Sequence, residues 1–138
     1  MNTLDMQPID FDQWGFRGFM LLVDGQPIYE VPGVVFSEIS YWEFAEEQAA
    51  LKRDADQLDY HQLIGVCDCG FAGCGATWVR VVKEAGNVLF SEFSGLQKHE
   101  EPRTLTFTAE NYNEVMARMD VLAESYRVLD AAARSAQS

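Results

Sequence analysis

The stretch LIGVCDCGFAGCGATWVRVVKEAGNVLFSEF, from Leu63 to Phe93, decides the fold of this chain. It contains all three cysteines, a cluster of glycines and two runs of alternating apolar and polar side chains. The runs are 76–83 and 88–93, and the loop 84–87 between them offers Gly and Asn, which tolerate positive φ. This pattern predicts a β-hairpin.

A further strand is expected directly before this hairpin. The run 63–69 is short, apolar and rich in β-branched residues, and it leads into the hairpin through 70–75. Three of those six linking residues are glycines, which favour a tight turn of the backbone. The sequence therefore predicts three consecutive antiparallel strands.

A second hairpin is expected near the N-terminus. The apolar run 14–23 reads as a buried strand, and Asp24-Gly25 after it is a strong hairpin turn signal. The return strand is expected at 28–31, and it is short or lies at an edge because Pro32 ends it. Residues 34–39 are expected to extend the sheet or cross over it.

Two helices complete the expected fold. Ser40 and Glu43 have the spacing of a capping box at the start of an amphipathic helix in the middle of the chain. Leu105–Phe107 is expected as a short strand, and Thr108 as the N-cap of a helix over about 109–134. We therefore expect an α+β fold, with an antiparallel sheet of about five to six strands built from hairpins. The C-terminal helix should pack on one face of this sheet.

The length of 138 residues predicts one domain, with residues 1–13 and 135–138 loosely held. No apolar run approaches the roughly 20 residues that cross a bilayer. The acidic N-terminus does not resemble a secretory signal, and an odd number of cysteines does not suggest a disulfide framework. A cytoplasmic location is therefore expected.

The net charge is −12, from 10 basic and 22 acidic residues. Such a surface repels nucleic acids and anionic membranes, so neither is expected as a partner, and it favours a basic protein. The other interpretation is that the charge serves only solubility. Self-association is left open.

The acidic middle of the chain is the candidate partner-binding surface. Between Phe36 and Tyr60 there are seven acids and two bases, with Tyr41, Trp42 and Tyr60 as aromatic anchors among them. A solvated helix face is the alternative interpretation. The candidate partner-binding residues are Glu38, Trp42, Glu43, Glu46, Glu47, Asp54, Asp56 and Asp59.

The cysteines suggest a different function. Cys67 and Cys69 alternate on a strand and can share a face, and Cys74 can return across the glycine turn, with His61 or His99 as a fourth zinc ligand. A redox disulfide between Cys69 and Cys74 is the other form of this alternative. The spacing departs from the usual zinc knuckle, so simple packing of free cysteines is preferred. No cofactor is expected.

Four motifs carry a resemblance: V-D-G-x-P at 23–27, C-x-C-G-x-x-G-C-G at 67–75, W-x-R-V at 78–81 and F-S-x-F at 90–93. Their order resembles that of a group of small bacterial proteins with a C-x-C-G-x-x-G-C element before a β-hairpin. This resemblance implies a shared fold and no particular activity. In size, acidity and absence of a catalytic set, the chain also resembles immunity proteins of bacterial toxin systems, including contact-dependent growth inhibition.

The sequence offers no nucleophile with a positioned base, so an enzyme is not expected. The hypothesis is a non-enzymatic acidic binding protein, an immunity protein that neutralises a basic, nuclease-type toxin by covering its active site. The alternative is a small zinc-binding or thiol-redox protein that uses the three cysteines.

Overall fold

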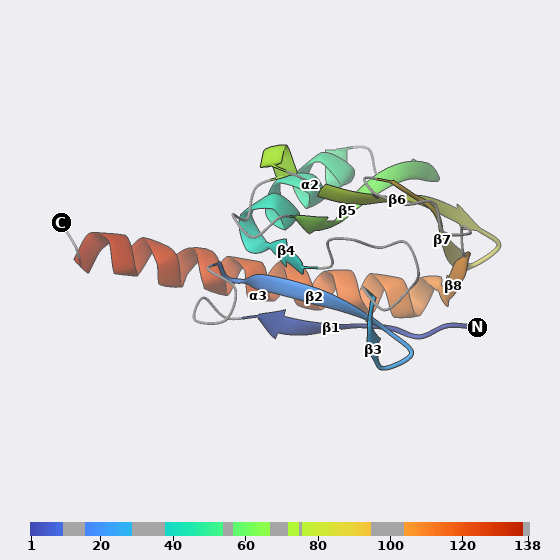
Figure 1. Ribbon diagram of the computed structural model, residues 1–138, viewed down its shortest axis with the longest axis horizontal. Coiled ribbons are helices and arrows are strands. Elements are labelled where there is room, and N and C mark those ends of the chain that lie inside the picture. Colours follow the sequence, from blue (N-terminus) through green and yellow to red (C-terminus); the bar gives the residue numbers. More distant parts are fainter. Residues whose placement is uncertain are drawn as a thin grey trace.

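The computed structural model describes residues 1–9, 16–28, 38–53, 57–66, 72–74, 76–94 and 104–136 (Figure 1). These residues form eight strands, two α-helices and one short 3-10 helix. In chain order they are β1 (Leu4–Ile9), β2 (Gly18–Val23), β3 (Gln26–Pro27), β4 (Glu38–Ser40), α2 (Tyr41–Arg53), β5 (Asp59–Val66), η2 (Ala72–Cys74), β6 (Ala76–Glu84), β7 (Asn87–Ser94), β8 (Leu105–Thr108) and α3 (Ala109–Ala136).

The first sheet is built around β2. Strand β1 pairs along all of one side of β2, and the short strands β3 and β4 share the other side. The turn between β2 and β3 has positive φ at both Asp24 (53°) and Gly25 (81°), which confirms the hairpin turn. The return strand is only Gln26–Pro27, and residues 29–31 of the expected strand lie outside the described residues.

Gly18 lets β4 approach β2 closely. A Cβ atom at this position would lie 2.0 Å from the carbonyl oxygen of Ile39. Gly18 pairs with Ser40, and the amide of the next residue, Tyr41, donates to the carbonyl of Arg17 at 3.0 Å. The close approach therefore fixes the point at which α2 begins.

The second sheet has the order β5-β6-β7-β8 and is antiparallel throughout. The three consecutive strands expected from the sequence are β5, which precedes η2, and β6 and β7, which follow it. Strand β8 pairs with β7 at the edge of the sheet. Ala85 (φ 50°) and Gly86 (φ 78°) form the tight turn between β6 and β7. The prediction of three consecutive antiparallel strands is confirmed. The positive φ expected at Gly86 and Asn87 occurs at Gly86 and Ala85 instead.

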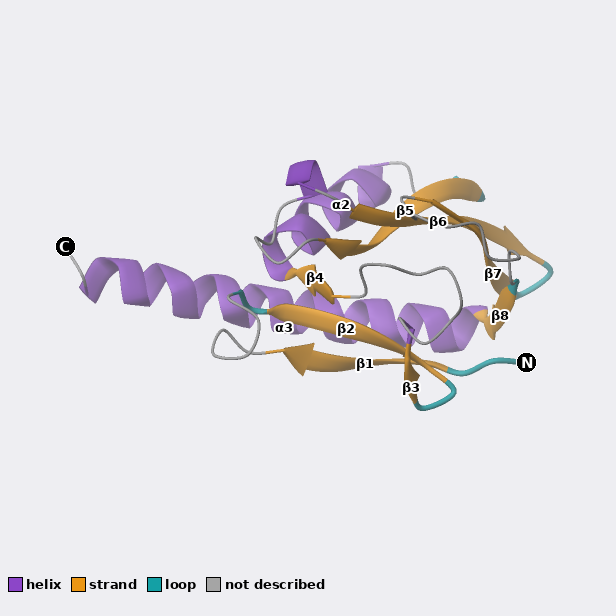
Figure 2. Ribbon diagram, in the orientation of Figure 1, coloured by secondary structure: helices purple, strands orange, loops and turns teal. Residues whose placement is uncertain are grey.

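Helix α3 lies between the first sheet on one side and α2 with the second sheet on the other (Figures 1 and 2). Its first part is packed into the core, where the largest fully buried side chains include Phe19, Phe44, Phe90, Phe107 and Met119. The α+β fold with a middle helix and a C-terminal helix is confirmed. The described strands divide into two four-stranded sheets instead of forming one.

The N-terminal residues join the two sheets. The backbone amide of Asn2 donates to the carbonyl of Thr106 at 2.7 Å. The side chain of Asn111 accepts from the backbone amide of Leu4 at 2.7 Å and donates to the carbonyl of Leu4 at 2.9 Å. Within the segment 1–13, which was expected to be loosely held, Leu4–Ile9 form an edge strand. Pro8 is accommodated because it lies on that edge.

Neither of the two α-helices in the described part of the chain combines the length and the apolar character that a membrane crossing requires.

Candidate functional site

Among the described residues, the acids of the predicted binding surface differ in exposure and in contacts. Glu46 is exposed on α2, and Glu38 is half-buried on β4. Asp54 and Asp56 lie outside the described residues. The remaining acids of the predicted surface, which are Glu43, Glu47 and Asp59, contact other parts of the protein.

Glu47 points into the protein. Its Oε2 accepts a hydrogen bond from the amide of Leu63 at 2.8 Å, beside the irregularity in the pairing of β5 with β6. Its Oε1 is shielded from solvent and has no hydrogen-bond partner among the described residues. Burial raises the pKa of Glu47 to about 8, and the nearby Glu43 adds to this increase. Glu47, a candidate partner-binding residue in the sequence, thus directs its carboxyl group toward β5.

Glu43 faces the same direction, one helical turn earlier. Its Oε1 lies 3.3 Å from the amide of Ala72 in η2, which donates to it. The two glutamates therefore connect α2 to β5 and to η2. This is the position at which the sequence predicted only the polar face of an amphipathic helix.

Asp59 is exposed and belongs to an ion-pair network on the second sheet. Both of its oxygens accept from Arg80, at 2.9 and 2.6 Å, and Arg80 also reaches Glu92 at 3.2 Å. The hydrogen bonds from Arg80 lower the pKa of Asp59. Its charge is thus partly neutralised within the protein.

Tyr60, expected as an aromatic anchor, is buried instead, with 7% of its surface exposed. Its hydroxyl lies 2.9 Å from that of Tyr112, which donates to Oε1 of Gln62 at 2.5 Å. Gln62 in turn donates to the sulfur of Met116 at 3.5 Å. These groups form a buried polar cluster that joins β5 to α3, so Tyr60 contributes to the fold and is not available to a partner.

The alternative function, a zinc-binding or thiol-redox site, depends on residues that are largely outside the described ranges. These are Cys67, Cys69 and His99. Cys74 ends η2, and His61 is exposed on β5. Within the described ranges, no group of three or more histidine, cysteine or acidic residues is arranged to hold a metal ion.

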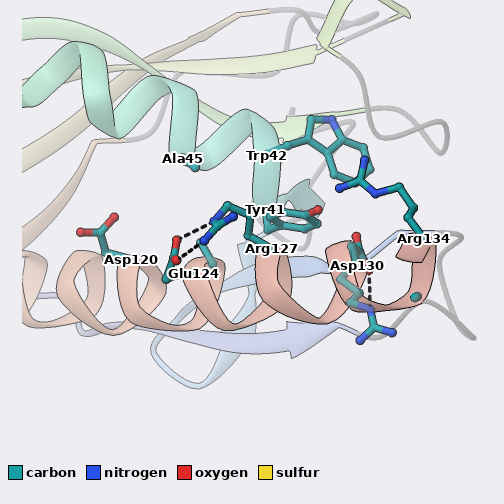
Figure 3. Close-up of a pocket in the computed structure, with 11 residues that line it drawn as sticks. Tyr41, Trp42, Ala45, Asp120, Glu124, Arg127, Asp130 and Arg134 are labelled. Atoms are coloured by element: carbon teal, nitrogen blue, oxygen red, sulfur yellow. Dashed lines mark hydrogen bonds and ion pairs between the residues drawn. The ribbon is translucent and has the colours of Figure 1, made fainter. Parts of the chain in front are cut away.

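A groove of about 940 Å³ lies between the start of α2 and the C-terminal part of α3 (Figure 3). One wall is α2 with Tyr41, Trp42 and Ala45, and the other is one side of α3. The complete lining is Arg17, Tyr41, Trp42, Ala45, Asp120, Ala123, Glu124, Arg127, Asp130, Ala133 and Arg134. Of the predicted binding residues, Trp42 lies here.

Aromatic rings support this groove from within. The rings of Tyr41 and Trp42 meet edge to face with centroids 5.2 Å apart, and Phe16 lies 6.1 Å from Trp42. Tyr126 of α3 lies 6.1 Å from Tyr41. Burial and a hydrogen bond to Asp130 raise the pKa of Tyr41, so its hydroxyl stays protonated at neutral pH. The aromatic wall is therefore uncharged.

Charged residues of both signs surround this wall. Arg127 binds both oxygens of Glu124, at 2.9 and 2.6 Å, and Arg17 lies 3.1 Å from Asp130. The side chain of Arg134 extends from α3 toward Trp42 (Figure 3). The lining contains three arginines and three acids, so the groove carries no net charge in a chain of −12.

Sequence reasoning named Tyr41 and Trp42 but missed the arginines. Arg127 and Arg134 are spaced seven residues apart and so lie on one side of α3. That spacing was visible in the sequence. Arg17 comes from a distant segment, and only the folded structure brings it to the groove.

The described lining offers tyrosine, tryptophan, carboxylate and guanidinium groups and no serine, cysteine or histidine. These groups suit the binding of a polar and aromatic surface more than nucleophilic chemistry. Comparisons with models of protein families, with curated proteins and with solved structures find no match to this chain.

Proposed function

We propose that this chain is a non-enzymatic protein-binding protein of the immunity type, which neutralises a basic toxin by covering its active site. The observation that supports the proposal most is the groove between α2 and α3. Tryptophan, tyrosine and arginine are the residues that most often dominate binding energy at protein interfaces, and all three occur together there.

Charge and groove have separate roles in this proposal. The net charge of −12 attracts a cationic partner over long distances and so raises the association rate. The neutral groove then supplies close contacts through Trp42, which slow dissociation. A basic partner is therefore captured by the whole surface and held at one place.

The structure also decides which acids can test the proposal. Glu43 and Glu47 accept backbone hydrogen bonds within the protein, so changing them alters the fold as well as the surface. Glu46 lies on the same helix, is exposed, and suits a test of charge alone.

The experiment measures binding to any basic protein that a neighbouring gene encodes, by calorimetry and surface plasmon resonance. Trp42→Ala should raise the dissociation constant about tenfold or more, mainly through faster dissociation. Glu46→Lys should slow association, and added salt should remove this difference. Leu58→Ala, at an exposed apolar residue outside the groove, is the control.

Unchanged affinity of a folded Trp42→Ala variant would contradict the groove as the docking site. Absence of binding to any basic neighbour, at low salt and at equal concentrations, would contradict the immunity role itself.

A further inference from the structure

The acidic side chains of the groove between α2 and α3 already have partners within the protein. Glu124 pairs with Arg127 at 2.6 Å, and Asp130 pairs with Arg17 at 3.1 Å. Asp120, the third acid of the lining, also has an interaction inside the chain. A ligand that entered the groove would therefore find its carboxylates occupied.

Arg134 differs from the other charged residues of the groove. Within the part of the chain that the structure describes, it forms no hydrogen bond or ion pair. Its side chain is exposed, comes from the last turn of α3 and extends toward Trp42 (Figure 3). The charge that the described lining leaves available to a ligand is thus positive, although the whole chain carries −12.

An aromatic surface lies next to this positive charge. Trp42 is half-buried, and the rings of Tyr41 and Phe16 support it from within, with centroids 5.2 and 6.1 Å away. The lining also includes the small exposed residues Ala45 and Ala133. Small side chains leave space beside the indole, and an aromatic ring of a ligand can pack there in a stacked or edge-to-face arrangement.

We propose that the groove binds an acidic side chain of its partner that lies directly beside an aromatic one. The carboxylate pairs with Arg134, and the aromatic ring packs against Trp42. This inference rests on the proposed function and deepens it, because it names the part of the toxin that the groove recognises. The planar guanidinium group can bind both oxygens of one carboxylate, which makes the contact directional.

A basic side chain is the occupant that the net charge alone would suggest. In the groove it would have to displace Arg127 from Glu124 or Arg17 from Asp130, and Arg134 would repel it. An acidic side chain displaces none of these pairs. The groove therefore selects a segment whose charge is opposite to that of the basic partner as a whole, and this selection gives specificity among basic surfaces.

Two capped dipeptides test the proposal with the full chain. They are acetyl-Trp-Glu-amide and its neutral counterpart, acetyl-Trp-Gln-amide. An NMR titration follows the indole N–H signal of Trp42, which the Trp42→Phe variant assigns. The acidic peptide should bind about two- to fivefold more tightly than the neutral one, as expected for a single exposed ion pair. In Arg134→Gln this preference should disappear, while both peptides still bind.

Arg118→Gln is the matched control. Arg118 is another exposed arginine of α3, lies outside the groove lining and pairs with Asp5 at 3.0 Å. This variant should keep the preference for the acidic peptide. Circular dichroism of both variants shows whether α3 persists, because Arg134 lies in its last turn.

Three results would overturn the proposal. They are equal affinity for the two peptides, a preference that survives in folded Arg134→Gln, and no shift of the Trp42 signal at millimolar peptide. A third peptide, acetyl-Gln-Trp with a free C-terminal carboxylate, tests the source of the charge. If it binds more tightly than acetyl-Trp-Glu-amide, Arg134 recognises a chain terminus, and the side-chain proposal is wrong.

The peptide titration does not involve the toxin, so the two proposals can fail separately. A basic protein that binds through Trp42, together with equal peptide affinities, would contradict only the acidic and aromatic segment. A clear peptide preference without any basic partner would contradict only the immunity role.

The sign of one charge change tests the same contact in the complex. Arg134→Glu adds two units of negative charge to a chain of −12, so long-range attraction alone would strengthen binding to a basic partner. The proposal expects the opposite, with dissociation about fivefold faster or more, because two carboxylates would then meet. Arg118→Glu makes the same change outside the groove and should not speed dissociation. Tighter binding of Arg134→Glu would overturn the proposal.

Discussion

The two halves of α3 make opposite use of one continuous helix. In the first half Tyr112, Val115, Met116, Met119 and Ala123 are buried between the two sheets. In the second half at least half of the surface of Val128 and Leu129 is exposed, and one side of the helix lines the groove. Helical periodicity is the same in both halves. The comparison shows that an amphipathic pattern specifies a helix without specifying what will cover it.

The largest effect expected from this comparison is on core packing. Met119→Ala removes a side chain that is 1% exposed and should lower the free energy of unfolding by about 2–5 kcal/mol. Val128→Ala, the same truncation class in the second half, should change it by no more than about 0.5 kcal/mol. Urea unfolding measures both. Equal losses would remove the distinction between the halves.

The next effect concerns the buried polar cluster of the first half. Tyr112→Phe removes the hydroxyl that donates to Gln62 and should cost about 1–3 kcal/mol, because Gln62 Oε1 loses its donor. The ring itself should still pack against Phe90, whose centroid lies 6.0 Å away. Urea unfolding of this variant reports the hydroxyl alone, and unchanged stability would show that water replaces it.

A further effect should depend on pH and involves the buried carboxyl group of Glu47 on α2. Its pKa is raised from 4.5 to about 8 in the folded protein, so the folded state holds a proton that the unfolded chain releases. Stability should therefore fall as pH rises from about 4.5 to about 8, and then level off. The neighbouring charged group that adds to this rise in the pKa is Glu43.

In the Glu47→Gln variant the side chain at this position cannot ionise. The variant should therefore be more stable than the wild type above about pH 8 and similar to it near pH 5. Thermal unfolding across this range measures the difference. A wild type whose stability is level between these pH values would show that the carboxyl reaches water.

The smallest effect is expected in the second half. Arg127→Gln breaks the pair with Glu124, whose side chains are 60% and 62% exposed, and should not change the unfolding free energy measurably. Urea unfolding beside the wild type checks this. A clear loss would mean that the second half supports the fold after all.

Local signals in the sequence predicted the elements well. The Asp24-Gly25 turn, the three consecutive strands and the start of α3 were all found, because each depends on residues near in the chain. Thr108 does accept from the amide of Asn111, at 3.0 Å, as expected of an N-cap. The strand β1 was missed although Leu4 and Met6 alternate with polar residues, because the polar and acidic composition of residues 1–13 suggested a loose end.

The candidate site depended on distant contacts, and there the sequence was less informative. Glu47 looked like any other acid on a polar helix face, and its burial follows from the position of β5 against α2. Tyr60 looked like a surface anchor, and its burial follows from Tyr112, fifty-two residues later. The composition showed that the net charge is negative. It could not show which acidic side chains accept hydrogen bonds within the folded protein.

The hydrogen bonds that Asn111 makes to Leu4 span 107 residues, nearly the length of the chain. During synthesis the first strand cannot reach this partner until the start of α3 has left the ribosome. Closing so large a loop is entropically slow. The hairpins can therefore form early, while the final closure of the core should be among the last steps of folding.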